Sequence, residues 1–299
     1  MSIDRKAHMA ALGANIIFAG NFTAIKLISP DFIKPFALNV VRVIVSVLLF
    51  WGLYLMKPSS AGIKKKDVGK FLICGATGVA INQMFFVKGM SLTTSIHGAL
   101  LMLATPIFIS FIAMWLLREQ MNKLKIAGLG LGISGAAILI SMREVTGSGS
   151  NILLGDTFVL INAISYAFYM VLVRPLMTEY SPIHALRWTF TFGAFMILPF
   201  GWNEFSEVNW QIFTLNAWIA LTFIVIGATF FAYLLTVYSI NKIGASTTGA
   251  YIYTQPVFAT IIAVFVAGET ITLYKILAGI LILSGVLLVN KKQVTEEVN

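Results

Sequence analysis

The stretch TPIFISFIAMWLLREQ at residues 105–120 and the stretch QPVFATIIAVFVAGET at residues 255–270 follow one pattern. Each has a proline at its second position, continues through a nearly unbroken apolar run and reaches a glutamate near its end. Without a gap, residues 105–140 and 255–290 share ten identities in thirty-six positions. The chain therefore contains an internal repeat with an offset of 150 residues.

The composition is that of a membrane protein. Hydrophobic residues make up 58% of the chain and charged residues 11%, whereas soluble domains carry roughly 25% charged residues. A membrane-spanning helix needs about 20 mostly apolar residues to cross roughly 30 Å of hydrocarbon. Ten such segments occur, at about 8–27, 35–56, 68–88, 95–117, 123–142, 153–174, 183–200, 213–238, 246–267 and 271–290. We therefore expect an all-α integral membrane protein with ten transmembrane helices, because these segments are too long for barrel strands.

The repeat divides the chain into two halves. The first covers residues 8–142, a linker rich in Gly and Ser covers 143–152, and the second half covers 153–290. Each half holds five predicted spans, and because five is odd the halves must enter the membrane with opposite orientations. Two inverted five-helix repeats are typical of secondary transporters, whose solute site lies near the midplane between the repeats.

The basic residues predict the orientation, since cytoplasmic loops are enriched in Lys and Arg. With a cytoplasmic N-terminus, the cytoplasmic segments hold Arg5, Lys6, Lys57, Lys64, Lys65, Lys66, Lys70, Arg118, Lys123, Lys125, Arg174, Lys242, Lys291 and Lys292. The outer segments hold Lys26, Lys34, Lys88, Arg143 and Lys275. Both termini are therefore predicted to be cytoplasmic. The net charge of +9 is explained by this topology and does not indicate a nucleic-acid partner.

The prolines and glutamates of the repeated stretches have different expected roles. Pro106 and Pro256 lie about ten residues into their spans, and proline bends a membrane helix at a place where neighbouring groups can satisfy the backbone. We expect these bends to open a cavity near the midplane. Glu119 and Glu269 precede the next helix, where a carboxylate favours a helix N-terminus, so they serve as structural anchors or as gating groups.

Polar and aromatic residues inside the spans are the candidate solute-binding groups. Asn82, Gln83 and Phe86 cluster on one helical face, and Tyr233 is the repeat partner of Gln83. The alternative for each of them is hydrogen bonding between helices. The full predicted set is Asn21, Asn82, Gln83, Phe86, Tyr166, Tyr169, Tyr233, Tyr251 and Gln255. Together these groups suit an amphipathic or zwitterionic solute.

Arg42 is the clearest charge inside a span. It either reaches the surface or pairs with Asp31, or it binds a substrate carboxylate. The acidic residues lie near span ends or in loops, so no carboxylate for a proton relay is expected within the membrane. The three histidines are scattered without partner spacing, and no Walker motif occurs. We therefore predict no metal, no cofactor and no catalytic residues.

Small residues and a glycine-bearing last helix complete each half. A segment that contains small residues precedes each apolar run, SIHGALLMLATP in the first half and STTGAYIYTQP in the second. A segment that contains glycine follows each run, AGLGLGISGAAILI in the first half and AGILILSGVLLV in the second. These features, over residues 8 to about 290, resemble the EamA family of the drug/metabolite transporter superfamily. Gly128, Gly132 and Gly135 are interpreted as helix-packing or dimer contacts.

The resemblance implies a multi-pass carrier of the bacterial inner membrane that exports amino acids or other small metabolites. With the residues above, it predicts a secondary transporter that works by alternating access. Its expected partners are a small-molecule substrate and the lipid bilayer, and the protein is expected to be a monomer or weak homodimer. A nucleotide-sugar or organophosphate carrier remains an alternative, as does a lipid-modifying membrane enzyme.

Overall fold

The computed structural model describes residues 3–56, 62–117, 151–243, 248–249 and 251–290, with scattered positions between 127 and 138. Within these residues all regular structure is helical. The α-helices are α1 (Ile3–Ile28), α2 (Pro35–Met56), α3 (Val68–Gly75), α4 (Ile81–Leu92), α5 (Ser95–Met102), α6 (Thr105–Leu117), α8 (Ile152–Glu179), α9 (Pro182–Ser206), α10 (Leu215–Thr222), α11 (Ala232–Ile243), α13 (Gln255–Ala267) and α14 (Leu273–Asn290). The predicted all-α fold is confirmed.

The predicted membrane spans correspond to helices wherever the structure describes them. Among the described residues, five helices are long and apolar enough to cross a membrane: Arg5–Ile28, Pro35–Met56, Lys65–Leu92, Ile152–Glu179 and Leu215–Ile243. The predicted span 123–142 lies largely outside the described residues. Large apolar side chains cover the outer surface, including Leu55, Phe265 and Leu273. A lipid bilayer would cover this apolar surface, whose exposure to water would be unfavourable.

The spans that contain the repeated prolines are broken helices, which corrects the predicted bend. In the first half, α5 ends at Met102 and α6 begins at Thr105, so Pro106 lies in the first turn of α6. In the second half, a short 3-10 helix at Tyr251–Thr254 precedes α13, and Pro256 lies in the first turn of α13. Proline lacks an amide hydrogen, and the first turn of a helix does not need one. Each proline therefore starts a helix segment instead of bending a continuous helix.

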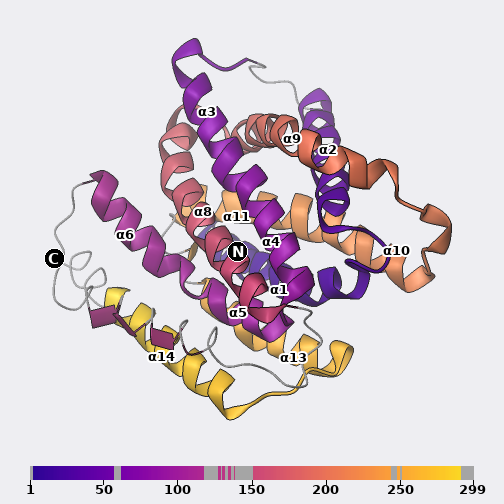
Figure 1. Ribbon diagram of the computed structural model, residues 1–299. Helices are drawn as coiled ribbons and strands as arrows, with labels where there is room; N and C mark the ends of the chain where they lie inside the picture. Colours follow the sequence, from indigo (N-terminus) through magenta and orange to yellow (C-terminus); the bar gives the residue numbers. More distant parts are fainter. Residues whose placement is uncertain are drawn as a thin grey trace.

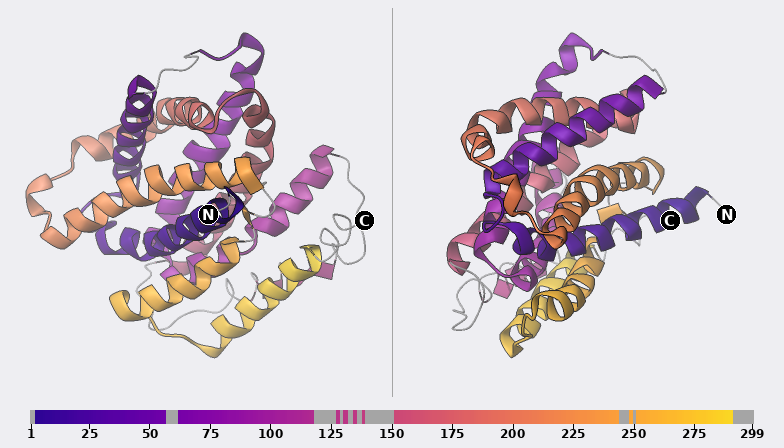
Figure 2. Two further views of the ribbon diagram at one scale, coloured as in Figure 1. Left: turned by 180° about the vertical axis from the view of Figure 1, so that it is seen from behind. Right: turned by 90° about the vertical axis from the view of Figure 1, so that its right-hand side faces the viewer.

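The two halves pack into one another. The first helix of the first half, α1, packs against α11 and α13 of the second half, while α8, the first helix of the second half, packs against α4. Figure 1 shows α2, α3 and α9 on one side of the molecule and α13 and α14 on the other, and the views in Figure 2 agree.

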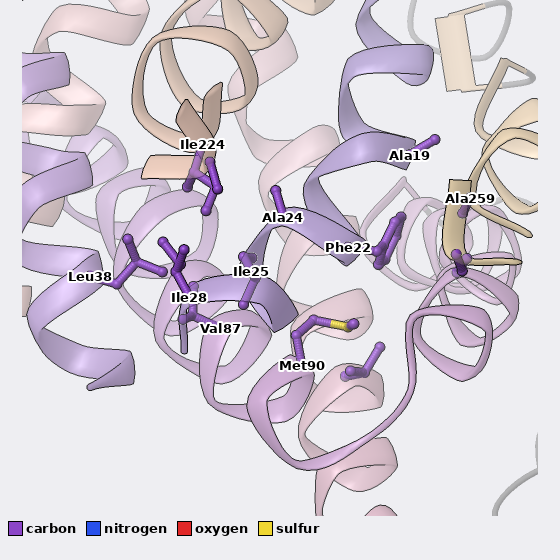
Figure 3. Close-up of a cluster of buried hydrophobic side chains, with 14 of the residues drawn as sticks. Ala19, Phe22, Ala24, Ile25, Ile28, Leu38, Val87, Met90, Ile224 and Ala259 are labelled. Atoms are coloured by element: carbon purple, nitrogen blue, oxygen red, sulfur yellow. The ribbon is translucent and has the colours of Figure 1, made fainter. Parts of the chain in front are cut away.

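A central core cluster joins the halves. Phe22 and Ile25 of α1 lie with Met90 of α4, Ile224 of the helical segment Phe223–Phe231 and Ala259 of α13 in this cluster (Figure 3). All five side chains are buried. Because α1 supplies much of this core, its position determines how residues of both halves meet.

Candidate solute cavity between the two halves

A cavity of about 70 Å³ lies between the halves. Both halves contribute to its wall, as expected for an inverted-repeat carrier. The lining residues are Asn15, Phe18, Asn21, Phe22, Arg42, Asn82, Phe86, Met102, Asn162, Tyr166, Met170, Tyr233, Thr236, Thr248, Gly249, Ile252 and Gln255. Apolar atoms make up most of the wall, and eight of its seventeen residues are Asn, Gln, Thr or Arg, a combination that suits a small-molecule site.

Hydrogen bonds between the halves hold part of this wall. The Nε2 atom of Gln255 donates to Oδ1 of Asn15 over 2.6 Å. The Nδ2 atom of Asn162 donates to the backbone oxygen of Asn82 over 2.8 Å. The hydroxyl of Tyr233 lies 3.4 Å from Oδ1 of Asn82, which is long for a hydrogen bond. The same hydroxyl lies 3.4 Å from the backbone oxygen of Gly78, so both of these contacts are long.

Arg42 is buried at the cavity wall. Its side chain is 3% exposed, and its Nε atom donates to the hydroxyl of Thr229 over 2.9 Å. It does not reach the surface, and Asp31, its expected alternative partner, is exposed. The Nη1 atom of Arg42 has no hydrogen-bond partner among the described residues. The guanidinium therefore retains a donor that a carboxylate could accept.

Two acceptors at the cavity are also unpaired. Within the described part of the chain, Oδ1 of Asn21 and Oδ1 of Asn162 have no hydrogen-bond partner. Buried polar atoms are nearly always paired in native structures. Among the described lining residues, none is acidic. Residues of the cavity wall thus carry one cationic donor and two neutral acceptors that have no hydrogen-bond partner among the described residues.

Irregular helix segments lie beside the cavity in both halves. The third span of the first half contains a π-helical segment at Ala76–Ala80, and the third span of the second half contains one at Phe223–Phe231. Thr229, which accepts from Arg42, belongs to the second segment. The π-helical turns are frequent at functional sites. Neither segment was predicted from the sequence, because no local residue pattern distinguishes a π-helical segment from an α-helix.

The structure brings together most of the predicted binding residues and separates three of them. The predicted residues that line the cavity are Asn21, Arg42, Asn82, Phe86, Tyr166, Tyr233 and Gln255. Gln83 and Tyr169 are buried outside the lining, and Tyr251 bonds to His8. Asn15 and Asn162 were missed as lining residues, although an asparagine inside an apolar span was an available signal.

The glutamate at the end of the repeated stretch contacts the other half of the protein. The carboxylate of Glu269 accepts from the amides of Ser95 and Ile96 over 2.7 and 3.1 Å, so it caps the N-terminus of α5 rather than that of the next helix. A carboxylate there is favoured by the helix dipole. Glu119 lies outside the described residues.

A buried histidine meets a buried acid between the halves. The three histidines show no partner spacing in the sequence, yet the Nδ1 atom of His97 lies 2.8 Å from Oδ2 of Asp156. Asp156 lies in the first turns of α8, as expected of an acid near a span end, and its side chain is fully buried. The sequence separates these residues by 59 positions, so neither spacing nor a motif could reveal the pair.

Comparison with known proteins identifies the family. A model of the EamA-like transporter family matches residues 5–141 and again residues 153–291. An uncharacterized transporter of Archaeoglobus fulgidus is 25% identical over 97% of this chain and 99% of its own length. A protein of Streptantibioticus cattleyicolor named "Probable terminal-alkyne amino-acid exporter" is 24% identical over 77% of this chain and 75% of its own.

A solved structure shows the same fold. One crystal structure, at 16% identity, aligns with a TM-score of 0.63 over 98% of this chain and 97% of that chain. At this identity the likeness concerns the fold alone. The family match covers both helical halves that enclose the cavity. The chain therefore belongs to the EamA-like transporter family.

Proposed function

We propose that this protein is a secondary transporter that exports a small amphipathic carboxylate, such as an amino acid, across the bacterial inner membrane by alternating access. The observation that carries the proposal is the buried guanidinium of Arg42, with an unpaired donor, at a cavity whose described lining residues include no acid. A solute carboxylate would complete this site. The unpaired acceptors of Asn21 and Asn162 suit an ammonium group.

The alternatives fit these residues less well. A nucleotide-sugar or organophosphate carrier needs several cations to neutralise its phosphates, whereas Arg42 is the one Arg or Lys among the described lining residues. The relatives are named as transporters, which favours transport over a membrane enzyme. The relative named as an amino-acid exporter supports export of an amino acid.

A thermal-stability screen of the purified protein tests the solute class. Amino acids should raise the midpoint of unfolding, while their methyl esters should not, because an ester cannot pair with Arg42. A ligand at about 100 times its Kd stabilises a protein by about 2.7 kcal/mol, which the screen would detect. Stabilisation by nucleotide sugars or phosphate esters, with no response to carboxylates, would favour the alternative carrier.

The proposed orientation places both termini in the cytoplasm. Contacts join helix ends that this topology places on one side, Glu204 with the amide of Phe36 and Lys26 with the backbone oxygen of Thr93, and the distribution of basic residues assigns that side to the exterior. Reporter fusions after Lys66 and after Asn290 should give cytoplasmic signals, and a fusion after Asn209 an external signal. An external signal after Lys66 would reverse the orientation.

A further inference from the structure

Four exposed lysines lie at the start of the third span. Two of them belong to the short 3-10 helix Lys65–Asp67, which leads directly into α3. Figure 1 shows this end of α3 at the edge of the molecule, and the views in Figure 2 agree. We call the four residues the lysine cluster; they are Lys64, Lys65, Lys66 and Lys70, and all four are exposed.

The lysine cluster carries more positive charge than its neighbouring acids can balance. Glu179, at the end of α8, accepts from two of the lysines, over 2.6 and 3.3 Å. Asp67 is buried and accepts from Lys70 over 2.9 Å. Among the residues that the structure describes, Lys65 has no ion-pair partner. Four cations thus share two carboxylates, which leaves a surplus of two positive charges on an exposed surface.

An exposed apolar stripe continues from the lysine cluster along the same span. Lys66, Lys70 and Ile73 recur at spacings of four and three residues, so they lie on one face of the helix. We call Leu72, Ile73 and Ile81, which are all exposed, the apolar stripe. From Lys70 to Ile81 the helix rises about 16 Å, at about 1.5 Å per residue, which is about half of the roughly 30 Å of membrane hydrocarbon.

Aromatic rings mark the level of the membrane surface at this end. The guanidinium of Arg187 lies over the rings of Trp51 and Tyr54, near the end of α2. Its Nη2 atom lies 3.1 Å from Nδ1 of His184. The ring of His184 meets that of Tyr180, whose hydroxyl donates to the buried acid of the lysine cluster. Because Trp and Tyr are enriched where a membrane meets water, these contacts place the lysine cluster at the level of the lipid headgroups.

The opposite end of α2 shows no such surplus of positive charge. Lys34 is 56% exposed, as Lys70 is 55% exposed, and it pairs with Glu207 over 2.7 Å. A second acid, Glu204, accepts from the amide of Phe36 over 2.9 Å. A lysine of equal exposure is therefore balanced at that end, so exposure alone does not distinguish the lysine cluster.

A phospholipid with an anionic headgroup has the same order of groups as this surface. Its phosphate lies at the membrane surface, and its acyl chains extend through about half of the hydrocarbon. Lysine side chains bury their apolar stems and direct the charged end toward the headgroups. With the predicted orientation the lysine cluster lies on the cytoplasmic side, whose leaflet contains the anionic lipids that attract such basic segments.

We propose that the lysine cluster and the apolar stripe form a binding site for one phospholipid with an anionic headgroup. The lysines bind the phosphate, and the apolar stripe contacts an acyl chain. None of these residues is among the described residues that line the solute cavity. The site is therefore separate from the proposed transport function and does not depend on it.

Native mass spectrometry of the purified protein in detergent tests this site. Dioleoyl phosphatidylglycerol is the anionic probe, and dioleoyl phosphatidylcholine has the same chains without the net charge. The parent should bind one phosphatidylglycerol about 30-fold more tightly than phosphatidylcholine, because each of the two surplus charges contributes about 1 kcal/mol.

Lys65→Gln/Lys66→Gln removes this surplus and should bind the two lipids with affinities within about twofold of each other. Folding should persist, because Lys64 keeps its 2.6 Å bond to Glu179 and Lys70 keeps its bond to Asp67. Lys34→Gln, at the balanced end, is the matched control and should keep the preference of the parent.

Equal affinity of the parent for the two lipids, or an unchanged preference in the double variant, would overturn the proposal. Glycerol 1-phosphate, which has the phosphate but no acyl chain, should not displace the lipid at equal concentration. Displacement would show a site for a free anion and contradict a lipid site. If the double variant fails to fold, Lys65→Gln alone must reduce the preference about fivefold. Each of these failures leaves the proposed function unaffected.

Discussion

The cavity and the contact between α5 and α8 at His97 and Asp156, which we call the junction, both bury ionisable groups between the two halves, but only at the junction does each acid have close hydrogen-bond partners. There, Asp156 meets His97, and Glu269 meets two backbone amides at a helix N-terminus. At the cavity, Arg42 has the neutral hydroxyl of Thr229 and an unpaired Nη1 atom. Paired buried groups hold a structure together, whereas a buried cation without an acidic partner is available to bind an anionic ligand.

This difference gives distinct expectations for the two regions. Substitutions at the cavity should change solute affinity and leave folding nearly unchanged. Substitutions at the junction should change stability or the balance between conformations and leave the intrinsic solute contacts intact. A variant in one region that changed both solute affinity and stability would show that the two regions are coupled.

Arg42→Gln should have the largest effect on binding. A hydrogen bond to a charged group contributes about 1.5–3 kcal/mol, so the affinity for a carboxylate solute should fall roughly 10- to 150-fold. Binding to the purified protein by calorimetry measures this change. Folding should be preserved, because the substitution removes a buried charge that lacks an opposite charge.

Arg187→Gln is the matched control for Arg42→Gln. Arg187 is also buried, but it lies outside the cavity against the rings of Trp51 and Tyr54, 4.7 and 4.2 Å from their centroids. Its loss should lower thermal stability without a comparable loss of affinity. Equal losses of affinity in the two variants would remove the special role of Arg42.

Glu269→Ala should destabilise the folded protein by a moderate amount. The variant loses the cap on α5, and loss of a helix cap costs about 0.5–2 kcal/mol. Thermal unfolding measures this cost, while solute affinity at the cavity should stay within about twofold of the parent. Glu269→Gln, which keeps an acceptor, should recover part of the stability, and a large loss of affinity in either variant would place Glu269 at the solute site.

Tyr233→Phe should have the smallest effect. A hydrogen bond between neutral groups contributes about 0.5–1.5 kcal/mol, so the affinity should fall roughly two- to tenfold. Tyr238→Phe, on the same helix but outside the cavity lining, is the control and should bind as the parent does. Indistinguishable binding by Tyr233→Phe would return Tyr233 to a structural role.

The sequence predicted the helices better than the contacts between them. Apolar segment length is a local property, so α2 was predicted at its observed bounds, Pro35–Met56. Polar residues inside apolar spans also pointed to Tyr233 and Gln255 at the cavity. The His97–Asp156 pair was not predictable, because it forms only when α5 and α8 pack. The repeat likewise predicted that Gln83 and Tyr233 lie at the same depth in the membrane and both face the cavity. Only Tyr233 lines the cavity, because the direction of the Gln83 side chain depends on packing around α4.

The central claim is that the solute occupies the cavity between the halves, and cysteine protection tests it most directly. Thr236→Cys, at the cavity wall in a Cys74→Ala background, should react with a small polar maleimide. Any carboxylate that stabilises the protein should slow this reaction. Ser239→Cys, buried one turn along the same helix and outside the cavity lining, should show no such protection. Modification of Thr236→Cys at the same rate with and without every stabilising solute would contradict the account.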